Sequence, residues 1–414
     1  MRLLTIQAMP LALLTSACLL PSNASAEFFE DSKATLELRN LYFNRDFRQP
    51  GGSAASGQSK AAEWGQGFIF RGESGYTSGV LGLGVDAIGM VGFKLDSSHD
   101  RAGTALFPTG SDGDSQDEYS KLGITGKAKL SKTTAKVGTL IFRNQMLLSP
   151  DGRLLPQMFR GAMIESSEID GLTVQAAKIT DALPAQSGHW AKMVGNRIGG
   201  EGDYYAFYGG DYAPSSQSTI GLHYGKLDEV YQQYVANAGY TFNLSEDTSI
   251  KTEARFAKSS EDGSFRAIDN KAFGAMVTLR KSAHSFGVGY QKMRGDDPYP
   301  YVANSDPYLI NFIQINDFAN VNERSWQARY DLNLAAYGVP GLVFMTRYVT
   351  GDDVALSSGA TGKEWERDTD ITYAFQSGPL KNLSLRWRNA TVRSSFGNDL
   401  DENRLIVQYT IPLR

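Results

Sequence analysis

Basic side chains alternate with apolar ones in several short stretches of this sequence. Arg386 and Arg388, for example, alternate with Leu385 and Trp387. Side chains with this period of two lie on one face of an extended strand, about 7 Å apart along it. Guanidinium groups in such a row can donate paired hydrogen bonds to a carboxylate that has left bulk water, and can pass it from one group to the next. Binding of small anions is therefore the chemistry that these residues could perform.

Residue types that would indicate an enzyme or a metal site form no recognisable pattern. The four histidines are His99, His189, His223 and His284. They form no H-E-x-x-H pair, and no G-x-S-x-G motif is present. We therefore expect no catalytic residue, no metal site and no cofactor. Two other classes stay open as alternatives, namely an outer-membrane hydrolase whose site is assembled across loops and a soluble secreted binding protein.

The elements that would position the basic residues are strands of about ten residues. Polar and apolar side chains alternate in the stretches 34–42, 121–130, 250–256, 383–388 and 404–413. Charged residues on one face and strongly apolar residues on the other suit a closed transmembrane barrel, whose interior is wet and whose exterior meets lipid. A soluble sheet with one wet face is the alternative.

Connections of different length separate these stretches. Short, turn-rich ones such as 75–79 and 338–341 alternate with long polar ones such as 48–61, 96–117 and 181–202. Roughly twenty residues per strand and connection predict about eighteen strands, enough to enclose an aqueous lumen. The expected fold is therefore an all-β, antiparallel transmembrane barrel with no internal domain boundary.

Two long connections, 143–157 and 294–322, are too apolar for exposed loops. The first carries Leu147, Leu148, Leu154 and Leu155, and the second is rich in Tyr, Phe and Ile. We expect both to fold inward and constrict the lumen, with packing on the rim or against a partner subunit as the alternative. Their charged candidates are Asp151, Arg153, Asp296, Asp297, Asp306 and Asp317, although Asp-Pro pairs are also common in ordinary turns.

The N-terminus has the features of a secretory signal peptide. Arg2 precedes an apolar stretch up to Leu20, and Ala24-Ser25-Ala26 forms an A-x-A cleavage site. We therefore expect residues 1–26 to be a signal peptide and residues 27–414 to be one barrel domain. A membrane anchor, or a lipoprotein site at Cys18, is the alternative.

Composition narrows the remaining classes. The net charge of −4 argues against a nucleic-acid partner. No segment after residue 26 approaches the ~18 continuous apolar residues of a membrane-spanning helix.

The sequence resembles the OprD family of outer-membrane substrate-specific channels over essentially residues 27–414. The resemblance is carried by these segments in order: 38–46 (LRNLYFNRD), 64–68 (WGQGF), 84–87 (GVDA), 153–157 (RLLPQ), 268–270 (IDN), 289–293 (GYQKM), 325–331 (SWQARYD), 340–345 (PGLVFM) and 404–407 (RLIV). It implies an eighteen-stranded barrel with two inward loops, and a row of basic side chains facing acidic groups on those loops. Substrates of the family bear a carboxylate.

Residues that match the family's basic row are Arg39, Arg347, Arg386 and Arg388. Three lysines are further candidates only because they alternate with apolar residues and should therefore face the lumen: Lys121, Lys127 and Lys129. For each one, a charge paired with a neighbouring carboxylate is the alternative. One departure concerns assembly, because members usually end near an aromatic or apolar residue and this chain ends in Arg414.

The resemblance also implies the substrates and partners. The aromatic second segment favours aromatic or cyclic monocarboxylates, and basic amino acids or small peptides are the alternative. Expected partners are outer-membrane lipid and lipopolysaccharide, small anionic solutes and the barrel-assembly machinery. The expected oligomeric state is a monomer or a loose oligomer.

Overall fold

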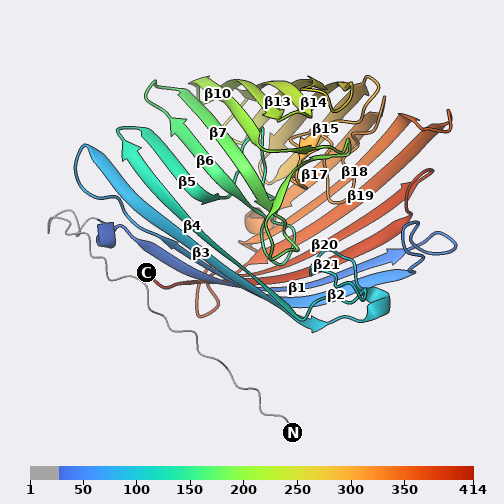
Figure 1. The fold of residues 1–414 in the computed structure, drawn as a ribbon, viewed down its shortest axis with the longest axis horizontal. Coiled ribbons are helices and arrows are strands. Elements are labelled where there is room, and N and C mark those ends of the chain that lie inside the picture. The colour runs from blue at the N-terminus through green and yellow to red at the C-terminus, as the bar shows by residue number, and fades with distance from the viewer. Residues whose placement is uncertain (1–27) are drawn as a thin grey trace, which may run out of the picture.

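The computed structural model describes residues 28–414, so the expected signal peptide 1–26 lies outside the described residues. Within this range, strands dominate, and helical structure is limited to residues 28–30 and two short 3-10 turns, η1 (His99–Arg101) and η2 (Leu334–Tyr337). Figure 1 shows the long strands side by side in one curved wall, with connecting segments inside it. No helix among residues 28–414 is long and apolar enough to cross a membrane.

Eighteen antiparallel strands close into a barrel, which confirms the predicted fold and strand number. Their bounds are β1 (Lys33–Phe47), β2 (Lys60–Glu73), β3 (Leu81–Asp96), β4 (Glu118–Leu130), β5 (Thr133–Leu140), β6 (Met158–Ser166), β7 (Leu172–Leu183), β10 (Tyr205–Ser215), β11 (Ser218–Leu227), β12 (Tyr231–Asn243), β13 (Thr248–Glu261), β14 (Asp269–Lys281), β15 (His284–Arg294), β17 (Arg324–Asn333), β18 (Leu342–Ala355), β19 (Thr361–Ala374), β20 (Leu383–Ser394) and β21 (Leu400–Pro412). The first and last strands pair from Thr35↔Pro412 to Phe47↔Leu400, so the sheet has no open edge there.

Alternation of side chains along each strand separates an apolar exterior from a polar interior. On β4, Leu122 is 71% exposed and Ile124 is 61% exposed. Lys121, which directly precedes Leu122 and points to the opposite face, is 4% exposed. The same holds on β20, where Leu385 and Trp387 are exposed and the alternating Arg386 and Arg388 face inward. Since a bilayer leaves no water for unpaired backbone groups, a closed sheet with this pattern suits a membrane-spanning wall.

Three connections fold into the barrel and fill much of it. They are 141–157, 184–204 and 295–323; the second contains β8 (Ala191–Asn196) and β9 (Glu201–Gly202), and the third contains β16 (Tyr301–Val302). Pairing of β8 with β16 joins the second and third connections. The first and third were predicted to fold inward and do so, whereas the inward course of 184–204 was not predicted.

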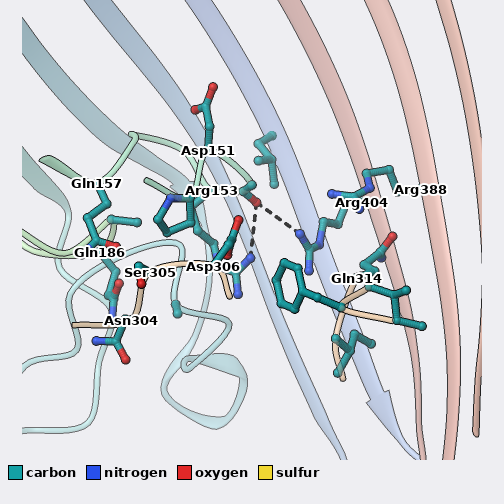
Figure 2. A pocket seen from close by; sticks show the side chains of 18 of the residues that line it. Asp151, Arg153, Gln157, Gln186, Asn304, Ser305, Asp306, Gln314, Arg388 and Arg404 are labelled. Carbon is teal, nitrogen blue, oxygen red and sulfur yellow. Dashed lines mark hydrogen bonds between the residues drawn. The ribbon is translucent and has the colours of Figure 1, made fainter. Parts of the chain in front are cut away.

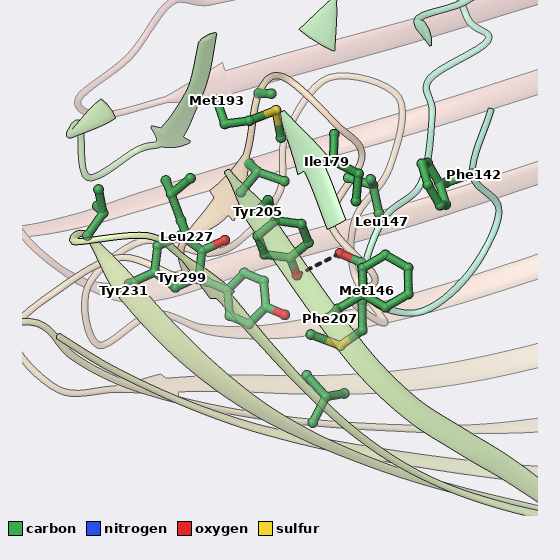
Figure 3. Close-up of a cluster of buried hydrophobic side chains, with 14 of the residues drawn as sticks. Phe142, Met146, Leu147, Ile179, Met193, Tyr205, Phe207, Leu227, Tyr231 and Tyr299 are labelled. Atoms are coloured by element: carbon green, nitrogen blue, oxygen red, sulfur yellow. Dashed lines mark hydrogen bonds between the residues drawn. The ribbon is translucent and has the colours of Figure 1, made fainter. Parts of the chain in front are cut away.

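Apolar side chains hold these connections against the wall. Figure 3 shows Met146 and Leu147 of the first connection beside Tyr205 and Phe207 of β10, in a cluster that also includes Tyr299 of the third. The Tyr205 hydroxyl donates a hydrogen bond of 3.2 Å to the carbonyl of Met146. A second cluster buries Leu154 and Leu155 completely, at the opposite end of the same connection. Each buried leucine contributes about 1.5–3 kcal/mol, which keeps the segment inside the barrel.

Candidate functional site

The three inward connections and the wall leave one large cavity of about 540 Å³. Strands β1, β20 and β21 supply a basic side, and the connections supply a mixed polar, acidic and apolar side. The lining residues used below are Arg39, Asp151, Arg153, Tyr301, Asn304, Ser305, Asp306, Phe312, Ile313, Asp317, Arg386, Arg388 and Arg404. Figure 2 shows Arg388 and Arg404 on one side, with Asp306, Ser305 and Asn304 facing them from the third connection.

Each arginine on the strands has a carboxylate behind it. Salt bridges of 2.7 Å join Arg39 to Glu37, and of 2.6 Å join Arg404 to Glu402. Arg386 donates from Nε to Asp370 at 2.9 Å. These carboxylates neutralise and orient the guanidinium groups inside the barrel, because an unpaired buried charge would be costly. The row is therefore already partly neutralised before any solute enters.

Two other guanidinium groups are paired less closely with carboxylates than these. Arg388 approaches Asp370 only at 3.4 Å, and its Nε has no hydrogen-bond partner. Arg153 has no carboxylate within salt-bridge distance among residues 28–414, and it donates only to the carbonyl of Gly152 at 3.3 Å. Burial, and then the nearby charge of Arg404, lower the pKa of Arg153 to about 9, so it stays protonated at neutral pH. The Nε of Arg388 is buried against Asp370, so an entering anion would meet the Nη groups of Arg388 and the guanidinium group of Arg153.

On the acidic side, Asp306 differs from its neighbours in forming no ion pair with another described residue. Asp151 is bound to Arg39 at 2.6 Å, and Asp317 is bound to Arg197 at 3.1 Å. Asp306 has no basic group within salt-bridge distance in the described part of the chain, and burial raises its pKa to about 6. Its backbone nitrogen donates to the carbonyl of Leu148 at 3.0 Å, which fixes the third connection against the first.

Other candidates from the sequence lie outside the cavity. Lys121 is buried, and its Nζ donates to the carbonyls of Pro156 at 3.0 Å and Pro184 at 2.7 Å, so it holds two inward connections. Arg347 is bound to Asp368 at 2.8 Å. Asp297 is bound to Arg266 at 2.6 Å near the end of the third connection.

The remaining candidates are distant from the constriction as well. Lys127 is bound to Asp86 at 2.6 Å toward the short-turn end of β4, and Lys129 is exposed beside Tyr76 at the same end. Asp296 is exposed and contributes nothing to the cavity lining.

Arg404 is a charged lining residue that was not predicted from the sequence. It is 2% exposed, and its Nη1 donates to the carbonyl of Gly152 at 3.2 Å, as Figure 2 shows. Its position between Leu405 and Asn403, with the inward parity of the last strand, was the signal that could have identified it.

The raised pKa of Asp306 predicts a pH-dependent anion flux. Above about pH 6 the carboxylate is charged and repels an anion, and below it the group is neutral. Loss of one nearby charge corresponds to ~1 kcal/mol, so the flux of benzenesulfonate, which stays ionised throughout, should rise up to about fivefold as the pH falls through this range. Liposome-flux measurements on wild type and Asp306→Asn test this. The variant should show the higher flux at every pH, and an unchanged pH profile in the variant would refute the assignment.

A closed barrel with an apolar exterior, a charged interior and inward segments that narrow the lumen defines a membrane pore. A sequence model described as outer membrane porin, OprD family, matches residues 26–413. The chain therefore belongs to the OprD family of outer-membrane porins. No cluster of three or more potential metal ligands occurs in residues 28–414.

Several characterised proteins are similar over nearly their whole length. Porin D of Pseudomonas aeruginosa is 36% identical, with 93% of this chain and 92% of that protein covered. The crystal structure of Pseudomonas aeruginosa OpdO is 50% identical, with a TM-score of 0.85, and 94% of this chain and 100% of that chain are covered. The structure of Pseudomonas aeruginosa OpdK with vanillate is 35% identical, with a TM-score of 0.87 and coverage of 93% and 100%.

Proposed function

We propose that this porin carries small carboxylate-bearing nutrients into the cell by passive diffusion, and that its substrates are aromatic or cyclic monocarboxylates. The observation that carries the proposal is that two guanidinium groups lining one cavity, those of Arg153 and Arg388, are only partly paired with protein groups. A carboxylate entering the cavity replaces its lost hydration with their donors. Arg39, Arg386 and Arg404 extend the row, and their counter-ions keep any single site from holding the anion too tightly.

The apolar part of the cavity supports a substrate with a ring. Tyr301, Phe312 and Ile313 of the third connection line the same space as the arginines. A flat apolar body can contact these side chains while its carboxylate faces the basic side. OpdK, whose structure contains vanillate, an aromatic monocarboxylate, is a relative with this overall fold.

Basic amino acids and small peptides are the second candidate class. The free carboxylate of Asp306 favours them, because it could receive an ammonium group while an arginine receives the carboxylate. Comparison of lysine with benzoate as solutes separates the two classes.

The test is solute flux through the purified full-length barrel in liposomes and planar bilayers. Benzoate at low concentration should enter at least about tenfold faster than benzamide, which has the same shape but cannot use a ~1.4 kcal/mol charge-assisted interaction. Equal rates for the two solutes would contradict the proposal. A preference for lysine over benzoate would favour the second class.

We further propose the setting in which the channel acts. Residues 1–26 are removed as a signal peptide, the barrel-assembly machinery inserts the remainder, and the barrel sits among outer-membrane lipid and lipopolysaccharide as a monomer or loose oligomer. It performs no catalysis. Lys121, Lys127, Lys129 and Arg347 act by positioning loops or by shaping the field along the wall, and Asp296 and Asp297 shape the outer end of the third connection.

A further inference from the structure

A second hollow of about 180 Å³ lies on the inner wall, on the short-turn side of the first inward connection. Strands β2 to β6 form it, and none of its lining residues lines the large cavity. Its charged lining residues are Arg71, Glu73, Asp86 and Lys136. A solute that leaves the constriction toward the short-turn end meets this wall.

Lys136 of β5 is a charge without a partner in this hollow. Among residues 28–414, no carboxylate lies within salt-bridge distance of its ammonium group and no acceptor receives a hydrogen bond from it. Lys127 of β4 is its direct cross-strand neighbour on the lumen face. Lys127 is occupied by Asp86 at 2.6 Å and by the carbonyl of Ser74 at 2.8 Å. Two like charges opposite each other are unfavourable, and an anion between Lys136 and the wall would relieve this repulsion.

Arg71 of β2 connects the hollow to the large cavity. Its Nη1 donates to Glu37 at 2.8 Å, and the other oxygen of Glu37 is bound to Arg39 at 2.7 Å. Arg39 lines the cavity and Arg71 lines the hollow, so one carboxylate separates two guanidinium groups that belong to successive sites. The side chain of Arg71 is 31% exposed, which leaves donors for a solute.

Apolar side chains complete the hollow. Ile88, Leu140 and Met163 line it, and they belong to or pack against the two buried clusters that hold the first connection. Thr125 and Thr139 add hydroxyl groups. Charge on one side and packed apolar atoms on the other suit a monocarboxylate with an apolar body.

We infer that this hollow is an exit site, in which Arg71 and Lys136 bind the carboxylate of a solute that has passed the constriction. Glu73 and Asp86 lie at its edge, where Asp86 is neutralised by Lys127 and Glu73 repels the anion toward the lumen. The site is weak because Lys136 is partly solvated, and weak binding allows release. The inference rests on the proposed carboxylate function and extends it to a second station.

The test uses the full-length barrel in planar bilayers, with benzoate as the probe. Benzoate is added to each chamber in turn, and the concentration that halves the single-channel current of a simple salt is measured for each side. Lys136→Met should raise this concentration about fivefold from one side only, the side on which the short turns lie. Lys136→Glu, which can pair with Lys127, should abolish the block from that side.

Lys251→Met is the matched control, because Lys251 has inward parity on β13 but lies far from the hollow and pairs with Glu253 at 3.1 Å. Benzoate should block this variant at the same concentration at which it blocks wild type. Without benzoate, Lys136→Met should unfold at the same or a higher temperature, since a like-charge pair is removed. Equal block of wild type and both Lys136 variants from both sides would overturn the exit site. Equal block by benzoate and benzamide in wild type would instead overturn the carboxylate function.

Discussion

Replacing Arg153 and Arg388 together with methionine is expected to lower benzoate flux at low concentration by about tenfold or more. These two guanidinium groups are the least paired of the arginines that line the constriction, and a hydrogen bond to a charged group contributes about 1.5–3 kcal/mol before water screens it. Benzamide flux should change little, because the amide does not depend on ionic donors. Liposome flux of both solutes through the same preparations gives the comparison.

The matched control is Arg153→Lys with Arg388→Lys, which keeps both charges and removes the planar fork of donors. It should recover part of the benzoate flux. Equal losses for benzoate and benzamide in the methionine variant would show that the two side chains shape the pore without recognising the charge.

Glu366→Ala is expected to release the tip of the third inward connection. Glu366 of β19 is fully buried and accepts hydrogen bonds from the backbone nitrogens of Ile315 at 2.9 Å and Asn316 at 2.8 Å. Loss of two hydrogen bonds to one buried carboxyl group costs about 2 kcal/mol, so the population with a displaced tip should rise roughly thirtyfold. Single-channel recording should show larger conductance, stronger current noise and weaker discrimination of benzoate from benzamide.

Two further variants serve as an intermediate case and as a control for Glu366→Ala. Glu366→Gln keeps one acceptor oxygen and should behave between wild type and the alanine variant. Asp352→Ala removes a carboxylate of β18 that pairs with the half-exposed Arg324 at 3.1 Å, and it should leave conductance unchanged. Quiet channels of normal conductance in Glu366→Ala would mean that apolar contacts of Ile313 and Phe318 suffice to hold the tip.

Period-two alternation made the barrel predictable, because a strand that separates lipid from water must repeat that separation in its side chains. β4 from Lys121 to Thr125 and β20 from Leu385 to Arg388 follow the predicted faces. The apolar content of 143–157 and 294–322 likewise predicted their inward course, since Leu154 and Leu155 need a dry environment.

The sequence did not predict which side chains pair with each other across neighbouring strands. Arg386 and Arg388 looked equivalent, yet Asp370 accepts hydrogen bonds from the first and forms only a longer ion pair, without a hydrogen bond, with the second. That difference depends on the register between β19 and β20, which no local pattern encodes. Lys121 was expected to face the lumen as a free charge, but its ammonium group donates hydrogen bonds to two loop carbonyls. The same argument explains why the connection 184–204 was not expected inside, because its few apolar residues find their contacts on other segments.

The pairing of β1 with β21 has a consequence for biogenesis. Thr35 meets Pro412 and Phe47 meets Leu400, so the seam joins residues from opposite ends of the chain. Until the last strand is present, the growing sheet has two unpaired edges, each of which could add a strand from another chain. Loop-closure entropy makes such a distant contact slow to form. Closure of the barrel therefore requires the last strand. A chain that lacks this strand can form most of its backbone hydrogen bonds and still cannot close into a sealed pore.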